Sequence, residues 1–244
     1  MATAAQARPA CDAPLRLLRF NNPLARVAKK LANHEPIVIV AIGSSSTQGA
    51  GASSKAANYP SRLEAELKRR FPTHAIKVIN RGIGGEVIAD MLKRFDREVV
   101  AAKPDLVLWQ LGTNAVLRDR PAANRRAAIR AGLAKIRATG ADVVLIDPQF
   151  APKVISKHDI DSMLQLISSV AKEENVSLFQ RFAVMKRWHD EDHLQFTTFV
   201  SPDGIHMNDW SYACMAKGLA AAIADATTRS MVSAAVRPLD GMAE

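Results

Sequence analysis

The chain has 244 residues, of which 48% are hydrophobic and 23% are charged, so its composition excludes collagen-like, coiled-coil and disordered proteins and suits one large globular domain. Lys and Arg number 33 against 24 Asp and Glu, and the net charge of +9 favours anionic partners such as an acidic polymer. Aromatic residues make up only 5%, which argues against nucleic-acid binding by base stacking, and no apolar run is long enough for a membrane span.

The N-terminal segment gives information on the cellular compartment of the protein. Ala5-Gln6-Ala7 matches the pattern that precedes a signal-peptidase cut, but no charged or apolar region lies before it. We expect a periplasmic or secreted protein whose export signal is not part of this chain, with a cytoplasmic protein as the alternative. Cys11 and Cys214 are compatible with one disulfide or with two free thiols, and their spacing does not predict a zinc site.

Predicted strands and helices alternate along the rest of the chain. Short apolar runs rich in β-branched residues predict strands at 36–42, 76–79, 105–111, 143–146 and 176–179. Helical spacing of apolar residues predicts helices that begin near Pro60 and that cover 86–102, 121–139, 159–174 and 208–227. This alternation predicts a parallel sheet between two layers of helices, with functional loops at the carboxyl ends of the strands.

Three segments at these strand ends combine Gly with small polar side chains, and the first contains a candidate nucleophile. The segment 43–49, GSSSTQG, matches neither a phosphate-binding P-loop nor a GxSxG elbow, because Ala50 stands where the P-loop has Lys and Thr47 stands where the elbow has Gly. A Ser-rich packing loop is one interpretation. The other is a Ser hydroxyl at a strand-to-helix turn that acts as a nucleophile.

A serine nucleophile needs a base and an acid that orients it, and one histidine has both the place and the partner. His206 follows Asp203 by three residues in a turn just before the last predicted helix. The Asp203 carboxylate can reach Nδ1 of the ring, which leaves Nε2 free to accept the serine proton. The other two strand-end segments, 80–85 (NRGIGG) and 112–115 (GTNA), offer backbone N–H groups and the Asn114 amide to a developing oxyanion, although each alone is more often a plain turn.

In this order the segments resemble the four blocks of the SGNH/GDSL hydrolase superfamily, over roughly residues 36–226. The resemblance implies a three-layer α/β/α, flavodoxin-like sandwich with a five-stranded parallel sheet in the order 2-1-3-4-5. It implies a catalytic triad of Ser45, Asp203 and His206, and an oxyanion hole made by Ser45, Gly85 and Asn114. Two positions depart from the blocks: Ser44 replaces the Asp before the nucleophile, and Ala115 replaces the Asp after the Asn.

The resemblance implies a serine-dependent hydrolase of carboxylic esters that uses no cofactor and no metal. We expect short acyl groups, such as acetyl, on a carbohydrate or cell-wall polymer. An acyltransferase of the same fold and a non-catalytic glycan-binding relative are the alternatives. The oligomeric state stays open. We expect an N-terminal tail and lead-in at 1–35, a catalytic domain at 36–228 and a C-terminal tail at 229–244.

Two further patterns suggest other sites. His189 and His193 are four residues apart with acids between them, and they could bind a metal if that segment were helical, but a solvated acidic face is the more ordinary interpretation. The basic run 118–137 indicates a solvated helix face, with an anionic-ligand surface as the alternative.

Overall fold

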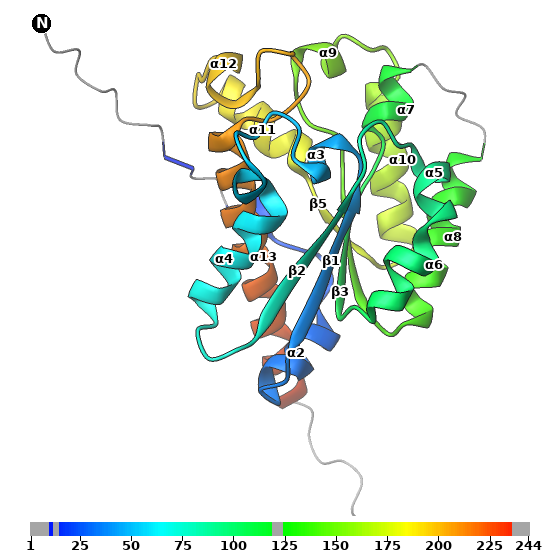
Figure 1. The fold of residues 1–244 in the computed structure, drawn as a ribbon, viewed down its shortest axis with the longest axis vertical. Coiled ribbons are helices and arrows are strands. Elements are labelled where there is room, and N and C mark those ends of the chain that lie inside the picture. The colour runs from blue at the N-terminus through cyan, green and yellow to red at the C-terminus, as the bar shows by residue number, and fades with distance from the viewer. Residues whose placement is uncertain (1–9, 12–14, 119–123, 236–244) are drawn as a thin grey trace, which may run out of the picture.

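The computed structural model describes residues 10–11, 15–118 and 124–235. A parallel sheet of five strands lies at its centre in the order β2-β1-β3-β4-β5, which confirms the predicted order (Figure 1). The strands are β1 (Ile37–Gly43), β2 (Ile76–Gly82), β3 (Leu106–Gln110), β4 (Asp142–Ile146) and β5 (Ser177–Phe179).

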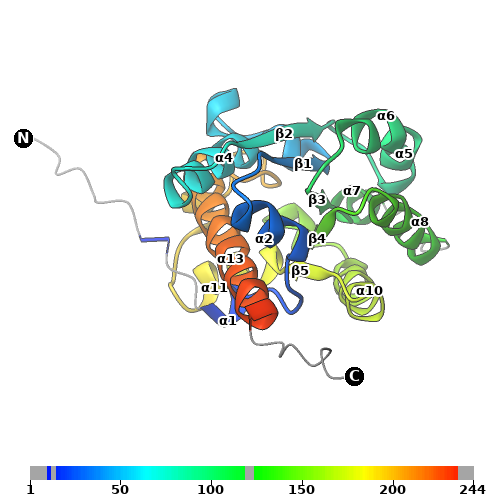
Figure 2. The same cartoon turned by 90° about the horizontal axis from the view of Figure 1, so that it is seen from below.

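Helices cover both faces of the sheet and make the predicted three layers (Figures 1 and 2). One layer contains α1 (Leu15–Leu18), α2 (Ala25–Ala32), α4 (Tyr59–Arg70), α11 (Arg181–Asp190) and α13 (Asp209–Ala235). The other contains α5 (Ile88–Lys93), α6 (Phe95–Glu98), α8 (Arg125–Ala138) and α10 (Ile160–Glu173). The short helices α3 (Ser45–Gln48), α7 (Thr113–Leu117), α9 (Pro152–Ile155) and α12 (Phe196–Phe199) lie towards the carboxyl ends of the strands, and two 3-10 turns cover Lys55–Ala57 and Val100–Ala102.

The sheet forms where the sequence predicts it because its strands are buried on both faces. Val40, Ala41 and Ile42 are fully buried in β1, so a continuous apolar run suits the strand better than an alternating one. At the start of α4, Asn58 Oδ1 accepts a hydrogen bond from Ser61 N at 2.9 Å and caps the helix.

Segment 86–102, predicted to be one helix, is broken into α5, α6 and a 3-10 turn. Met91 and Phe95 are buried as the spacing predicts, but Arg94 between the two helices has φ −112° and ψ 4° and is not helical. Its side chain is buried and contacts Glu86 and the carbonyl of Arg81. A buried ion pair therefore replaces the predicted continuous helix at this point.

The last helix continues past its predicted end at residue 227 and reaches Ala235. Arg229 bonds to Asp225 one turn earlier and donates to the carbonyl of Phe20 at 2.7 Å. Because this contact joins the helix to the N-terminal segment, the additional turns have tertiary support that helical spacing alone does not reveal.

Although α13 has 27 residues, no helix in the described part of the chain is both long and apolar enough to cross a membrane.

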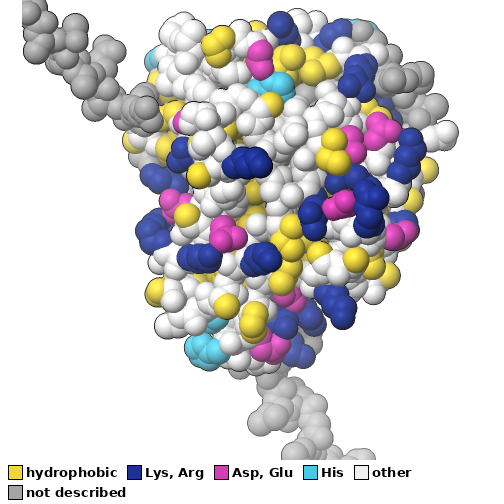
Figure 3. All heavy atoms as spheres, in the orientation of Figure 1, with side chains coloured by type: hydrophobic (Ala, Val, Ile, Leu, Met, Phe, Trp, Pro, Cys, Tyr) yellow, Lys and Arg dark blue, Asp and Glu magenta, His cyan; other side chains and the backbone are white. Residues whose placement is uncertain are grey.

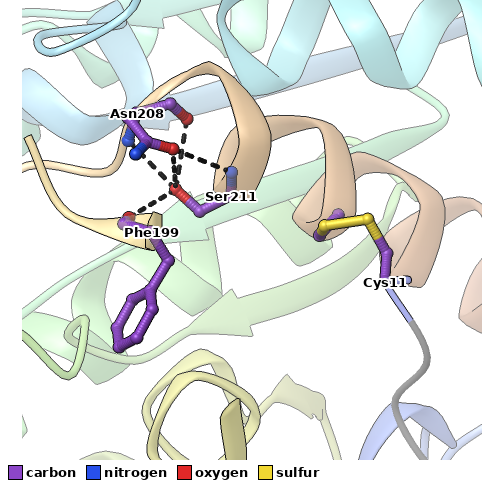
Figure 4. The surroundings of a disulfide bond; sticks show 5 residues. Cys11, Phe199, Asn208 and Ser211 are labelled. Carbon is purple, nitrogen blue, oxygen red and sulfur yellow. Dashed lines mark hydrogen bonds between the residues drawn. A yellow bond between two sulfur atoms is a disulfide. The ribbon is translucent and has the colours of Figure 1, made fainter. Parts of the chain in front are cut away.

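The two cysteines form a disulfide, which decides between the two possibilities that the sequence leaves open. Cys11 and Cys214 are 203 positions apart, and their sulfurs are bonded beside the first half of α13 (Figure 4). Cys214 is buried in the core cluster. The bond ties the N-terminal segment to the long C-terminal helix.

Candidate active site

The turn after β1 makes Ser45 the first residue of α3. Gly43 ends the strand, and a Cβ at that position would lie 2.2 Å from Thr47 Oγ1, so a larger residue does not fit. Ser44 is buried and donates from its backbone N and its Oγ to Gln110 Oε1, at 2.9 and 3.1 Å. Gln110 at the end of β3 therefore holds the turn, and the small Ser44 hydroxyl fits against it.

Ser45, His206 and Asp203 form one chain of hydrogen bonds. The Ser45 Oγ lies 2.7 Å from Nε2 of His206, and Nδ1 of His206 lies 2.5 Å from Oδ2 of Asp203. The serine and the histidine are 161 positions apart, and the structure brings all three predicted residues together. With the carboxylate accepting from Nδ1, Nε2 is left to accept the proton of the serine hydroxyl.

The surroundings of Asp203 keep its carboxylate ionised. Partial burial opposes the charge, but hydrogen bonds from the His206 ring and from the backbone N–H groups of His206 and Ile205 outweigh it and hold the pKa of Asp203 well below its usual range. The Ser201 hydroxyl donates a further bond at 2.7 Å. An ionised Asp203 can both orient the imidazole and stabilise its protonated form.

The NRGIGG and GTNA segments meet beside Ser45. A Cβ on Gly84 would lie 3.9 Å from Ser45 Cβ, and Gly85 has a φ of +79°, a conformation that favours glycine. Asn114, in the first turn of α7, donates one amide N–H to the carbonyl of Glu86 at 3.0 Å. The structure therefore brings the loops of Gly85 and Asn114 together next to the serine.

A buried ion pair that the sequence analysis missed supports this corner. Arg94 Nη2 lies 2.6 Å from Glu86 Oε2 and also donates to the carbonyls of Arg81 and Gly43, at 2.8 and 3.4 Å. One guanidinium thus connects the end of β1 with the loop that carries Gly85. Nothing in the sequence marks this pairing, because the partners are eight positions apart and lie on either side of α5.

A second missed residue, Gln149, lies behind the histidine. Its side chain is completely buried and accepts from Thr113 Oγ1 and from Arg181 Nη2, both at 2.9 Å, and donates from Nε2 to the carbonyl of Ile205 at 3.0 Å. It thereby joins the GTNA segment, α11 and the loop of His206. Gln149 lies three residues after the end of β4, in the loop at its carboxyl end, so the strand-end rule that selects the other three loops would also have found it.

His189 and His193, which the sequence suggests as a possible metal-binding pair, do not lie on one face of a helix. Helix α11 ends at Asp190, so His193 lies outside it, with a φ of +55°. The ring of His189 stacks on Phe196 at 4.4 Å between centroids, and its Nδ1 is 3.0 Å from the carbonyl of Leu194. Within the described residues, no three His, Cys, Asp or Glu gather as a metal site would require.

Much of the basic run 118–137 lies in α8 and pairs with acids. Arg126 and Arg130 contact Glu173, while Lys135 contacts Asp96, all within 3.0 Å. On the face shown in Figure 3, Lys and Arg side chains alternate with Asp and Glu. Arg118 lies apart from α8 and next to Gly85. A Cβ on Gly85 would be 2.8 Å from the Arg118 guanidinium.

Comparison with known proteins identifies relatives that are esterases. Acetylxylan esterase of Geobacillus stearothermophilus is 38% identical over 53 residues, which are 22% of this chain and 24% of that protein. Esterase TesA of Pseudomonas aeruginosa is 30% identical over 106 residues, 43% of this chain and 52% of its own. The aligned segments thus cover about a quarter and about half of these two curated relatives.

Solved structures share the fold. A two-domain esterase active on acetylated mannans, crystallised with mannopentaose, superposes with a TM-score of 0.72 at 20% identity, over 87% of this chain and 57% of that one. These solved structures share the three-layer fold that the resemblance to SGNH/GDSL hydrolases implies. A family model matches residues 10–229, and the chain belongs to the Non-GDSL lipase-like family.

Proposed function

We propose that the protein is a carboxylic ester hydrolase with Ser45 as nucleophile, His206 as general base and acid, and Asp203 as the orienting acid. The observation that carries the proposal is the unbroken hydrogen-bond chain, 2.7 Å from Ser45 Oγ to His206 Nε2 and 2.5 Å from Nδ1 to Asp203. A hydroxyl is a weak nucleophile unless an adjacent base removes its proton as it attacks.

In the first half of the reaction, Ser45 Oγ bonds to the ester carbonyl carbon while its proton passes to Nε2 of His206. The carbonyl oxygen becomes an oxyanion, which the backbone N–H groups of Ser45 and Gly85 and the second N–H of the Asn114 amide stabilise. The intermediate then expels the alkoxide, and His206 returns the proton to that oxygen. A water molecule repeats these steps on the acyl-serine and regenerates the free hydroxyl.

For the substrate we propose acetyl or another short acyl group on a carbohydrate. The support comes from the relatives, one of which is an acetylxylan esterase and another of which acts on acetylated mannans. An acyltransferase would use the same residues, and it would differ by passing the acyl group to an added alcohol and not to water. A non-catalytic glycan-binding protein would bind but not turn over.

A panel of p-nitrophenyl esters of increasing chain length tests this proposal. We expect the highest kcat/KM on acetate, and we expect Ser45→Ala to lower kcat by roughly 10³–10⁶. Ser46→Ala is the matched control, since the neighbouring hydroxyl is buried without a hydrogen-bond partner among the described residues and should be dispensable for turnover. Normal rates in Ser45→Ala would reject the nucleophile, and acyl transfer to added xylose in place of acetate release would favour the transferase.

We also propose a periplasmic or secreted location. The disulfide between Cys11 and Cys214 supports it, because such bonds persist mainly in oxidising compartments. Rapid alkylation of whole cells should leave both thiols unmodified until a reductant is added. Modification of both without reductant would favour the cytoplasmic alternative.

A further inference from the structure

A groove lies next to the Asp203–His206 pair, and apart from Asp203 its lining takes no part in the steps of hydrolysis. It has a volume of about 620 Å³ and is formed by the loop after α3, the segment between α12 and Asp203, and the start of α13. This volume falls within the range of roughly 300–1,000 Å³ that small-molecule sites occupy. Its lining includes Ala52, Thr198, Asp203, Asn208, Asp209 and Trp210.

Hydrogen bonds hold the walls of the groove in place. Asp209 accepts from the backbone N and the Oγ of Ser53, at 2.8 and 2.6 Å, which joins the start of α13 to the loop after α3. Asn208, the residue before α13, donates to the carbonyl of Thr198 in α12 at 2.9 Å and so joins these two segments. The groove is therefore formed before any ligand arrives, which lowers the entropic cost of binding.

The position of the groove follows from the direction of proton transfer. The leaving oxygen of an ester must lie near His206 Nε2 to receive its proton, so the alcohol half of the substrate lies on the histidine side of Ser45. The groove lies beyond the imidazole, on its Asp203 side: Asp203, which bonds to Nδ1, forms part of its wall with its side chain 44% exposed, and a Cβ on Gly51, another wall residue, would lie 3.0 Å from His206 Cβ. The carbonyl oxygen points the other way, towards Gly85.

The chemistry of the lining suits an uncharged polyhydroxy ligand. It combines two carboxylates, an amide, hydroxyls and the indole of Trp210, which is 9% exposed, and the part of the chain that the structure describes contributes no Lys or Arg to it. The groove therefore carries negative charge on a protein whose net charge is +9, and it repels uronates and phosphates. Trp210 is fixed by the edge-on ring of Trp188, 5.0 Å away between centroids.

We infer that this groove binds the neutral sugar units next to the sugar that carries the ester, and so selects uncharged acetylated glycans over acidic ones. The inference rests on the proposed function, because it takes the direction of the alcohol from the His206 mechanism. Hydroxyl groups of the sugar bond to the carboxylates and the amide, and the exposed part of the Trp210 indole contacts a sugar ring.

Filling the groove tests the inference. Ala52→Trp should raise KM for an acetylated xylo-oligosaccharide by about 10-fold or more, and it should affect p-nitrophenyl acetate, which has no neighbouring sugar, much less. Thr198→Trp fills the groove from another segment if the first variant does not fold. Ala101→Trp, which adds the same bulk at an exposed position near the amino end of β3, is the control and should leave both substrates unaffected.

A binding measurement separates this inference from the proposed catalysis. Calorimetry with deacetylated xylo-oligosaccharide should detect binding to Ser45→Ala, and Ala52→Trp should weaken that binding by about 10-fold. If glycan binds but no ester is hydrolysed, the groove stands and the proposed function fails. If esters are hydrolysed but Ala52→Trp and Thr198→Trp change glycan and aryl esters equally, or an acetylated oligogalacturonate is the better substrate, the groove inference is wrong.

Discussion

Replacing Gln149 tests how far one buried amide holds the site together. Gln149→Leu keeps most of the volume but removes an acceptor for Thr113 and Arg181 and the donor to the Ile205 carbonyl. Two bonds between uncharged groups contribute about 1 kcal/mol each, and one from a guanidinium about 1.5–3 kcal/mol, so the free energy of unfolding should fall by about 3.5–5 kcal/mol. At roughly 2–4 °C per kcal/mol for a domain of this size, Tm should fall by about 7–20 °C.

Urea unfolding and thermal unfolding measure this loss directly. Gln165→Leu is the matched control, because Gln165 is exposed on α10 and its replacement should change stability by less than about 0.5 kcal/mol. Since Ile205 precedes His206, Gln149→Leu should also lower kcat more than it raises KM. A loss of stability under about 1 kcal/mol would show that the three hydrogen bonds do not carry the energy assigned to them here.

The remaining predictions concern the oxyanion, the histidine and the disulfide. Asn114→Ala should lower kcat by roughly 10²–10³ with little change in KM, because the amide is engaged mainly in the transition state; a change confined to KM would make it a substrate-binding residue. Asp203→Asn, which removes the acceptor for the Nδ1 proton of His206, should lower the rate by up to ~10⁴; an unchanged rate would reject the triad. The pKa of Asp203 is lower in the folded than in the unfolded protein, so its ionisation stabilises the fold at pH values above the unfolded pKa, and this stabilisation is lost as the pH falls towards the folded pKa. In urea unfolding, Asp203→Asn should therefore lose more stability relative to the unsubstituted protein at pH 7 than at pH 3. Reducing the bond between Cys11 and Cys214, which are 203 positions apart, should lower stability by at most about 5 kcal/mol on the chain-entropy model, and an unchanged Tm in reductant would show that the tie is not stabilising.

Local patterns in the sequence were sufficient for the sheet and for the residues at its carboxyl edge. Runs such as 36–42 predict buried strands because helices cover both faces of a parallel sheet, and the alternation with helices orients all the strands the same way. Asp203 and His206 are three residues apart in a turn, so their contact is local. Ser45 could be placed near them because strand ends in such a sheet share one edge.

The sequence could not determine which groups pair across the fold. Arg94 and Gln149 bond to partners that belong to other elements, and only the packed chain decides which carbonyl or carboxylate lies within reach of each. The same holds for the length of α13, which depends on the contact between Arg229 and the Phe20 carbonyl. Periodicity records which face of a helix is apolar, whereas hydrogen bonds between distant segments depend on distances that exist only after the helices have docked on the sheet.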